Sequence, residues 1–163
     1  MSRRDLKYKN SRKMIALKDF DRVSLDDPNS KLTERCKFNF SYFDSSQQAG
    51  QAFSDLTKDQ LVNLLEKLKE FSKDSRLQLE GCQKFKNYKD FPLKTEFKHP
   101  SHIPHQAYWG AFRLGGKFRL VGFTVSPDYH GKEHPVTKQK YDKNTFYIVF
   151  IDLNHLFWIG KER

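Results

Sequence analysis

Hydrophobic residues gather in the last third of this chain and predict most of its sheet. Residues 108–114 and 117–125 are rich in aromatic and aliphatic residues and flank the pair Gly115-Gly116. A two-residue Gly-Gly loop supplies the positive φ angles of a primed turn, so this stretch predicts a β-hairpin. Residues 145–152 are apolar at successive positions, which indicates a central strand with both faces buried.

Residues 57–72 carry the pattern of an amphipathic helix. The run from Thr57 to Gln60 matches a capping box, and hydrophobic residues then recur at helical spacing. We expect this stripe to pack on the sheet as core; its members are Leu61, Leu64, Leu65, Leu68 and Phe71. A second, shorter helix is expected over residues 74–79, ending at Gly81.

Residues 37–44 alternate hydrophobic and polar side chains and predict a half-buried first strand. The predicted class is α+β, with an antiparallel sheet that contains residues 108–114, 117–125 and 145–152 and is covered by the N-terminal helices. Residues 36–163 are expected to form this one domain, behind a basic N-terminal extension of residues 1–35. The extension is either a phosphate-binding tail or a segment packed on the body.

The charge of the chain makes nucleic acid the first partner to consider. Among 163 residues, 30 Lys and Arg outnumber 20 Asp and Glu, which gives a net charge of +10. The isoelectric point is about 9.6. Such a balance suits RNA or a ribonucleoprotein, and a solvated basic surface is the plainer alternative.

Cysteine usage and hydropathy bear on the compartment. Cys36 and Cys82 stand in no C-x-x-C arrangement, so we expect reduced thiols rather than a disulfide framework or a zinc knuckle. No apolar run approaches the roughly 18 residues of a membrane span. Residues 1–5 lack the apolar stretch of a signal peptide. We therefore expect a cytoplasmic protein with no membrane partner.

Candidate functional groups concentrate in residues 82–106. This segment has little periodicity, its prolines keep it out of helix, and long irregular segments beside a sheet are commonly binding loops. His99, His102 and His105 have an H-x-x-H-x-x-H spacing. Their imidazoles could bind zinc, lie free in solvent, or contact RNA. Because no cysteine lies nearby as a fourth ligand, we expect no metal and no other cofactor.

Two polar residues stand out on or beside the strands predicted as core. Arg119 lies in the middle of its strand, with Trp109 and Arg113 expected on the same side of the hairpin. There a ring and two cations would stack a base and bind a phosphate. The alternative is a structural arginine paired with Asp152. His155, shortly after the last strand, is either a packed histidine or an acid–base group.

These elements together resemble the RelE/ParE toxin superfamily, in particular its YoeB-like ribosome-dependent endoribonucleases. The shared order is a helix pair, an irregular basic segment, a hairpin and a final strand followed by a histidine. Short matches carry the resemblance: Pro92-Leu93-Lys94, Tyr108-Trp109, Phe118-Arg119-Leu120-Val121 and His155. Those proteins cleave mRNA in the ribosomal A site with a basic concave sheet face. The resemblance therefore implies a RelE-like domain with RNA or the ribosome as partner, and an antitoxin protein as a further candidate partner.

The resemblance also assigns roles to residues. Arg119 would stabilise the charge that develops on the scissile phosphate, helped by Lys94, and His155 would protonate the leaving 5′-oxygen. Asp90 or Glu96 would take the proton of the attacking 2′-hydroxyl. We expect further contacts to RNA from six residues: Trp109, Arg113, Lys86, Lys89, Lys98 and Lys117.

Two departures from the family pattern support a competing interpretation. Phe91 stands where the family has a carboxylate before Pro-Leu-Lys, and Leu156 to Trp158 replace the tyrosine that follows the histidine. The competing interpretation is a non-catalytic RNA- or ribosome-binding module, or a phage or plasmid accessory protein, on the same scaffold. A third is a protein-interaction domain whose partner is an acidic, antitoxin-like chain.

Overall fold

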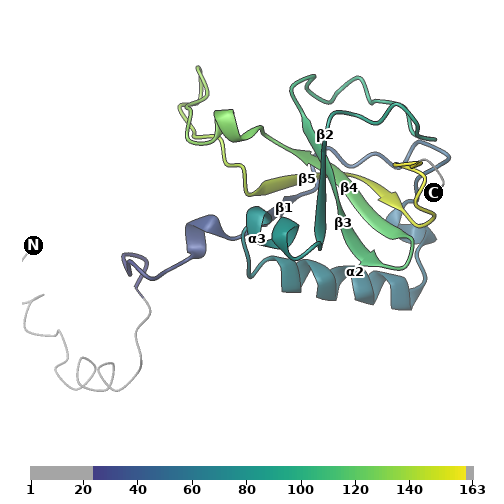
Figure 1. Cartoon of the computed structure of the whole chain (residues 1–163), viewed down its shortest axis with the longest axis horizontal. Helices are drawn as coiled ribbons and strands as arrows, with labels where there is room; N and C mark the ends of the chain where they lie inside the picture. The colour runs from purple at the N-terminus through teal and green to yellow at the C-terminus, as the bar shows by residue number, and fades with distance from the viewer. Residues whose placement is uncertain (1–23, 161–163) are drawn as a thin grey trace, which may run out of the picture. The chain divides into compact units, whose positions relative to one another are not determined.

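A computed structural model of the chain describes residues 24–160 (Figure 1). The chain divides into two units, residues 1–33 and 34–163, and the second unit holds the sheet and the two α-helices found within residues 24–160. The strands and helices are β1 (Lys37–Asn39), α2 (Lys58–Phe71), α3 (Arg76–Gly81), β2 (Phe85–Lys89), β3 (Tyr108–Gly115), β4 (Phe118–Thr124) and β5 (Thr145–Asp152). Three short 3-10 turns are η1 (Leu32–Glu34), η2 (Phe53–Asp55) and η3 (Pro127–Tyr129). The α+β class predicted from the sequence is confirmed.

The strands form one five-stranded sheet in the order β1-β5-β4-β3-β2. The expected antiparallel pairing holds from β2 to β5, but β1 pairs with β5 in parallel, so the sheet is mixed. β1 is also shorter than the predicted strand 37–44. It ends because the side-chain oxygen of Asn39 accepts a hydrogen bond from the backbone N–H of Ser41, and the chain turns there.

The hairpin lies where its Gly-Gly pair predicts. β3 and β4 pair from Tyr108 opposite Thr124 to Gly115 opposite Phe118. Gly115 and Gly116 have φ angles of +119° and +52°, conformations that side chains with a Cβ atom rarely adopt. Gly122 is required for a different reason. A Cβ atom there would collide with the carbonyl oxygen of Tyr147 in β5, so the close approach of β4 to β5 depends on this glycine.

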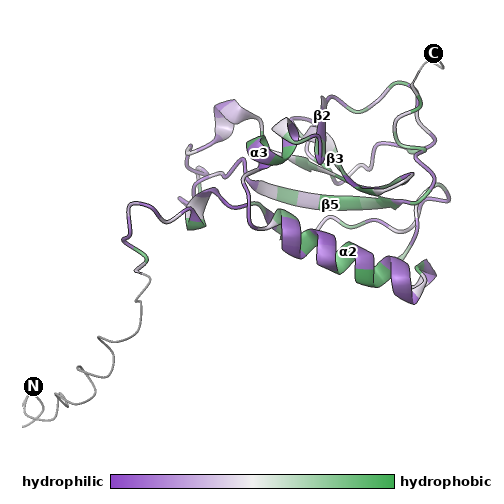
Figure 2. Cartoon of the chain, turned by 60° about the horizontal axis from the view of Figure 1, so that its bottom comes forward, coloured by the Kyte–Doolittle hydropathy of each residue, from purple (hydrophilic) through white to green (hydrophobic). Residues whose placement is uncertain are grey.

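The predicted helix over residues 57–72 is α2, with Thr57 as its N-cap. The Thr57 hydroxyl accepts a hydrogen bond from the backbone N–H of Gln60. In turn, the backbone N–H of Thr57 donates to the side-chain oxygen of Gln60. Leu64, Leu68 and Phe71 are buried against the sheet. Leu61 and Leu65 were predicted to join them, but they are 36% and 56% exposed. Figure 2 shows α2 lying along the sheet with hydrophobic and hydrophilic positions alternating around it. The second helix, α3, ends at Gly81 as expected.

Both faces of the sheet are covered, and each has its own hydrophobic core. On one face the two helices pack against the sheet through Leu64, Phe71, Leu79, Phe112, Leu120 and Phe146. On the opposite face, two irregular segments, 91–107 and 153–158, cover Trp109, Val121 and Phe150. Their large buried side chains are Phe97, Ile103 and Phe157, and Pro92 and Pro100 are also buried.

The irregular segment that follows α3 is therefore a structural layer as well as a loop. It begins with β2, an edge strand that the sequence did not reveal because its pattern is mostly polar. Trp109, expected to offer its ring to RNA, is only 1% exposed, since Phe91 and Phe157 pack against it. Trp109 does lie on the same side of the hairpin as Arg113 and Arg119, as the strand alternation predicts. At Trp109, however, the covering segments close that side off from solvent.

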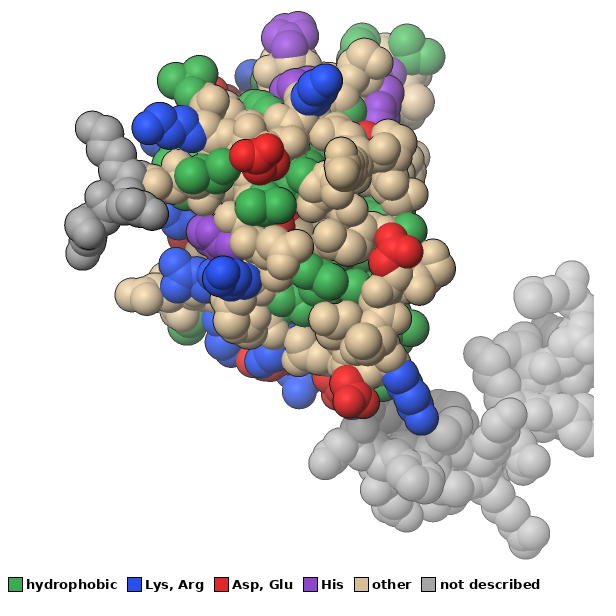
Figure 3. Space-filling view, turned by 90° about the vertical axis from the view of Figure 1, so that its right-hand side faces the viewer, with side chains coloured by type: hydrophobic (Ala, Val, Ile, Leu, Met, Phe, Trp, Pro, Cys, Tyr) green, Lys and Arg blue, Asp and Glu red, His purple; other side chains and the backbone are tan. Residues whose placement is uncertain are grey.

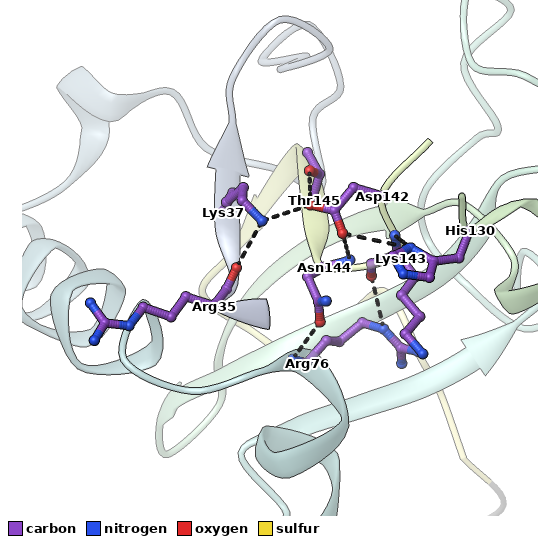
Figure 4. A network of polar contacts seen from close by, with 8 residues as sticks. All are labelled: Arg35, Lys37, Arg76, His130, Asp142, Lys143, Asn144 and Thr145. Atoms are coloured by element: carbon purple, nitrogen blue, oxygen red, sulfur yellow. Dashed lines mark hydrogen bonds and ion pairs between the residues drawn. The ribbon is translucent and has the colours of Figure 1, made fainter. Parts of the chain in front are cut away.

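A polar network fixes the edge strand β1 to the entry of β5 (Figure 4). Lys37 Nζ lies 2.6 Å from the Asp142 carboxylate, and the backbone N–H of Asn144 donates to the same carboxylate. The Asn144 side chain in turn accepts the N–H of Arg76 at the start of α3. Three segments far apart in the sequence are thus joined where the parallel β1–β5 pairing begins.

Candidate functional site

An open groove lies between the β3–β4 hairpin loop and the segment that follows β5. Its volume is about 750 Å³, and its lining consists of Gly116, Lys117, Arg119, Asn154, His155, Leu156, Trp158, Ile159 and Gly160. The structure therefore brings together Arg119, His155 and Lys117, which are separated by up to 38 positions in the sequence. We call this the basic groove. On the face in Figure 3, hydrophobic side chains lie exposed among scattered Lys, Arg, His, Asp and Glu side chains.

Asp152 builds the turn that presents His155 to the groove. Its buried carboxylate accepts hydrogen bonds from the backbone N–H groups of Asn154, Leu156 and Phe157, at 3.1, 3.0 and 2.9 Å. His155 lies inside this turn with a φ angle of +59°. A non-glycine residue in the left-handed region is uncommon and costs on the order of 1–3 kcal/mol, and such strain clusters at functional sites.

Arg119 is held by the backbone of its own hairpin and not by Asp152. Its Nη1 donates to the carbonyl oxygens of Gly116 at 2.7 Å and Phe118 at 3.0 Å. Both bonds come from the same nitrogen, so Nε and Nη2 have no partner among residues 24–160. The alternative of a structural ion pair with Asp152 is therefore wrong, because the carboxylate is taken up by backbone N–H groups.

A second arginine lies directly opposite Arg119. Arg113 and Arg119 are partners in the β3–β4 register, so their side chains emerge on the same face. Burial, and then the charge of Arg113, lower the pKa of Arg119 from its ordinary value. Like charges directly opposite each other in a sheet are destabilising. An anion bound between them would relieve that repulsion.

An exposed tryptophan beside the basic groove takes the place expected for Trp109. Trp158 is 41% exposed and stacks on Tyr88 of β2, with ring centroids 4.6 Å apart and planes 6° apart. Burial raises the pKa of the Tyr88 hydroxyl, against the opposing charges of Arg119 and Arg113. Sequence reasoning missed Trp158 as a site residue. The available signal was an aromatic residue in the short segment after the last strand, close in sequence to His155.

Lys94 lies in a second groove that shares one wall with the first. This groove, of about 300 Å³, is lined by Pro92, Leu93, Lys94, Trp158, Ile159 and Gly160. We call it the apolar groove, because Lys94 carries the only charge in its lining. Trp158 and its two C-terminal neighbours thus separate the two grooves.

Neither carboxylate proposed as a general base lines the basic groove. Asp90 and Glu96 are both exposed, and the lining contains no acidic residue. The two differ in their attachment to the site. The backbone N–H of Glu96 donates to the carbonyl of Leu156, next to His155, whereas that of Asp90 donates to Tyr88 in its own turn. Glu96 is therefore the better-placed of the two.

The remaining predicted RNA contacts lie outside both grooves. Lys86 and Lys89 are exposed on the edge strand β2, where charged side chains also hinder unwanted strand pairing. Lys98 is exposed, and its backbone exchanges two hydrogen bonds with the Gln47 side chain. Only Lys117 and Lys94, among the predicted lysines, line a groove.

The three spaced histidines have separate surroundings. His99 lies edge-on to Phe91 and Trp109, and His102 stacks on Tyr42, with ring planes 8° apart. Within residues 24–160, no group of three or more His, Cys, Asp or Glu side chains is arranged to hold a metal ion. The H-x-x-H-x-x-H spacing therefore does not gather its imidazoles at one point.

Comparisons with protein-family models, with curated proteins and with solved structures find no match to this chain. In the part of the chain that the structure describes, no helix is both long and apolar enough to cross a membrane.

Proposed function

We propose that this protein is an endoribonuclease that cleaves mRNA on the ribosome, with the basic groove as its active site. The observation that carries the proposal is that Arg119 of β4 and His155 of the turn after β5 line one groove. A fixed cation and an imidazole that can pass on a proton are two parts that phosphate-ester cleavage by an internal hydroxyl uses. The observed order of helix pair, hairpin and final strand also fits the RelE/ParE resemblance.

The chemistry follows from the positions of these two groups. The ribose 2′-oxygen attacks the adjacent phosphorus, the bond from phosphorus to the 5′-oxygen breaks, and a 2′,3′-cyclic phosphate and a 5′-hydroxyl result. The guanidinium of Arg119, with its free Nε and Nη2, binds the phosphate oxygens as their charge grows. His155 gives a proton to the leaving 5′-oxygen.

The base that takes the 2′-hydroxyl proton is assigned to Glu96. Its backbone N–H donates to the carbonyl of Leu156, which lines the basic groove, whereas no acidic side chain is part of the lining itself. The ribosome lowers the demand on this base, because a bound mRNA that is already oriented for in-line attack needs less acid–base assistance.

A non-catalytic RNA- or ribosome-binding module is the second candidate. The absence of Asp and Glu from the groove lining favours it. Arg119, Lys117 and Trp158 would then bind phosphate and base without cleavage, and the resemblance would reflect the scaffold alone.

Incubation of the purified protein with translating ribosomes, followed by mapping of mRNA 5′ ends, separates the two candidates. The parent protein should produce new ends, and a 2′-deoxy nucleotide before the cut should block them. Arg119→Ala should lower cleavage about 100-fold or more, and Lys140→Ala, an exposed lysine outside the grooves, should not. Ribosome binding without new ends from the parent protein would establish the non-catalytic candidate.

Salt dependence tests the shared part of both candidates. Binding of RNA or ribosomes should weaken steeply as salt rises, because phosphate binding by Lys and Arg releases counterions. Arg119→Ala should reduce that slope by about one ion. A flat titration of the parent protein would remove nucleic acid as the partner.

A further inference from the structure

Trp158 is exposed to solvent although its side chain is held in place by a stacking contact. Tyr88 packs against one face of its indole ring, yet the residue keeps 41% of its surface in solvent. The other tryptophan, Trp109, is fully enclosed in the core. Large aromatic side chains are usually covered, so a rigid, half-open indole beside a basic groove calls for a ligand.

Hydrogen bonds on both sides fix the backbone that carries the indole. The N–H of Phe157 donates to the Asp152 carboxylate at 2.9 Å, and the N–H of Ile159 donates to the carbonyl of Lys94 at 3.1 Å. Phe157 itself is buried and packs against Tyr88. The ring is thus positioned before any ligand arrives, which reduces the entropy that a bound group must lose.

Chemically different surfaces meet at this ring. On one side lies the basic groove with Arg119 and Lys117, and on the other lies the apolar groove with Leu93 and Ile159. A nucleotide has the same division, with a charged phosphate at one end and a flat, weakly polar base at the other. The cations on the basic side favour this occupant over an apolar protein segment.

We propose that the Tyr88–Trp158 stack is a platform for one unpaired base of the RNA, adjacent to the phosphate bound by Arg119. The proposal rests on the proposed function only in taking RNA as the substrate. A base in a duplex has both faces covered by its neighbours, so the platform selects single-stranded RNA. Lys94 is the only polar side chain in the apolar groove, so the base is bound by stacking, with little discrimination among sequences.

Tryptophan fluorescence tests the platform directly, because the chain has two tryptophans and only Trp158 is exposed. Titration with a short single-stranded RNA should quench the exposed indole, whereas a duplex of the same length should quench it much less. The same RNA with an abasic residue at each position in turn should lose quenching at one position. Trp158→Phe should abolish the signal while it keeps most of the affinity.

Affinity measurements on variants complete the test. Trp158→Ala should weaken binding of single-stranded RNA about tenfold or more, with an unchanged salt slope, because stacking and not a phosphate contact is lost. Leu77→Ala is the control, since Leu77 is an exposed hydrophobic residue of α3 that lines neither groove, and it should leave the affinity unchanged within about twofold.

The outcomes separate this proposal from the nuclease proposal. RNA that binds without quenching Trp158, or with equal affinity to Trp158→Ala, overturns the platform even if ribosomal mRNA is cleaved. Quenching and a Trp158→Ala defect without any cleavage support the platform and leave a non-catalytic RNA-binding protein.

Discussion

Arg119 and Asp152 face each other across the β4–β5 register, yet the carboxylate of Asp152 serves the backbone and leaves the guanidinium to the groove. Each residue then has a separate task. Asp152 shapes the turn that carries His155, and Arg119 keeps donors available for an anion. The juxtaposition still matters electrically, because the buried carboxylate partly offsets the repulsion between Arg119 and Arg113.

This division predicts effects of very different size on stability for two substitutions. Asp152→Ala should lower the free energy of unfolding by about 2–4 kcal/mol, because it leaves backbone N–H groups without their charged acceptor. Arg119→Ala should change it by less than about 1 kcal/mol, since the side chain is half-exposed. Urea denaturation of both variants measures the difference. A strongly destabilised Arg119→Ala protein would restore the structural interpretation of this arginine.

The left-handed backbone at His155 predicts that the site is kept at the expense of stability. His155→Gly should leave the free energy of unfolding unchanged or raise it by up to about 1 kcal/mol, because glycine adopts this φ angle without strain. The same change should abolish cleavage, as the proton donor is gone. Thermal denaturation and the ribosome assay together give the result; a destabilised glycine variant would mean that the imidazole is a packing element.

The central sheet was predictable because its signals are local. A Gly-Gly pair between two apolar runs fixes the hairpin, and the capping box at Thr57 fixes the start of α2. The parallel pairing of β1 with β5 has no comparable local signal, because it depends on how the chain returns after β4. The edge strand β2 was missed for a different reason: its sequence is mostly polar, so it shows no hydrophobic pattern.

The candidate site was only half predictable. Arg119 and His155 stood out as polar residues among apolar ones, and they do meet in one groove. Trp109 was misjudged because the second covering layer has no regular pattern, although Phe97 and Ile103 within it are hydrophobic. The apolar positions on both sides of the hairpin strands were the available clue, since two apolar faces require two covers. Trp109 is covered by this layer, and the tryptophan that is exposed to solvent is Trp158.

The two leucines in the middle of α2 predict a contrast that tests the helix packing. Leu64→Ala should lower the free energy of unfolding by about 2–5 kcal/mol, because Leu64 is buried in the core between α2 and the sheet. Leu65→Ala, on the adjacent and largely exposed position, should cost less than about 1 kcal/mol. Similar losses at both positions, measured by urea denaturation, would contradict the observed rotation of the helix.

The two cysteines should differ sharply in reactivity. Burial raises the pKa of the Cys36 thiol to about 12, whereas Cys82 is exposed. A thiol reagent at pH 8 should therefore modify one cysteine in the native protein and two after denaturation, because the thiolate is the reacting form. In Cys82→Ser the native protein should be inert. Rapid labelling of that variant would show that Cys36 is accessible and that the packing around β1 is looser than described.

The last prediction concerns acid stability at the β1–β5 edge. Burial opposes ionisation of Asp142, but hydrogen bonds from Lys37 and the Asn144 backbone N–H outweigh it, and the pKa of Asp142 lies below its ordinary value. A carboxylate with a depressed pKa in the folded state stabilises the protein above its unfolded pKa, near 3.9, and loses that contribution as the pH falls.

Asp142→Asn should therefore be less stable than the parent at pH 6, and the difference should shrink below about pH 4. A double-mutant cycle with Lys37→Met isolates the pair, and its coupling free energy should decrease as the pH falls below the unfolded pKa and toward the depressed pKa of Asp142. Since this pair fastens the edge strand to the entry of β5, its loss should also expose β1 to faster amide hydrogen exchange. A coupling that is the same at pH 6 and pH 3 would contradict an ionised Asp142 as the source of the stabilisation.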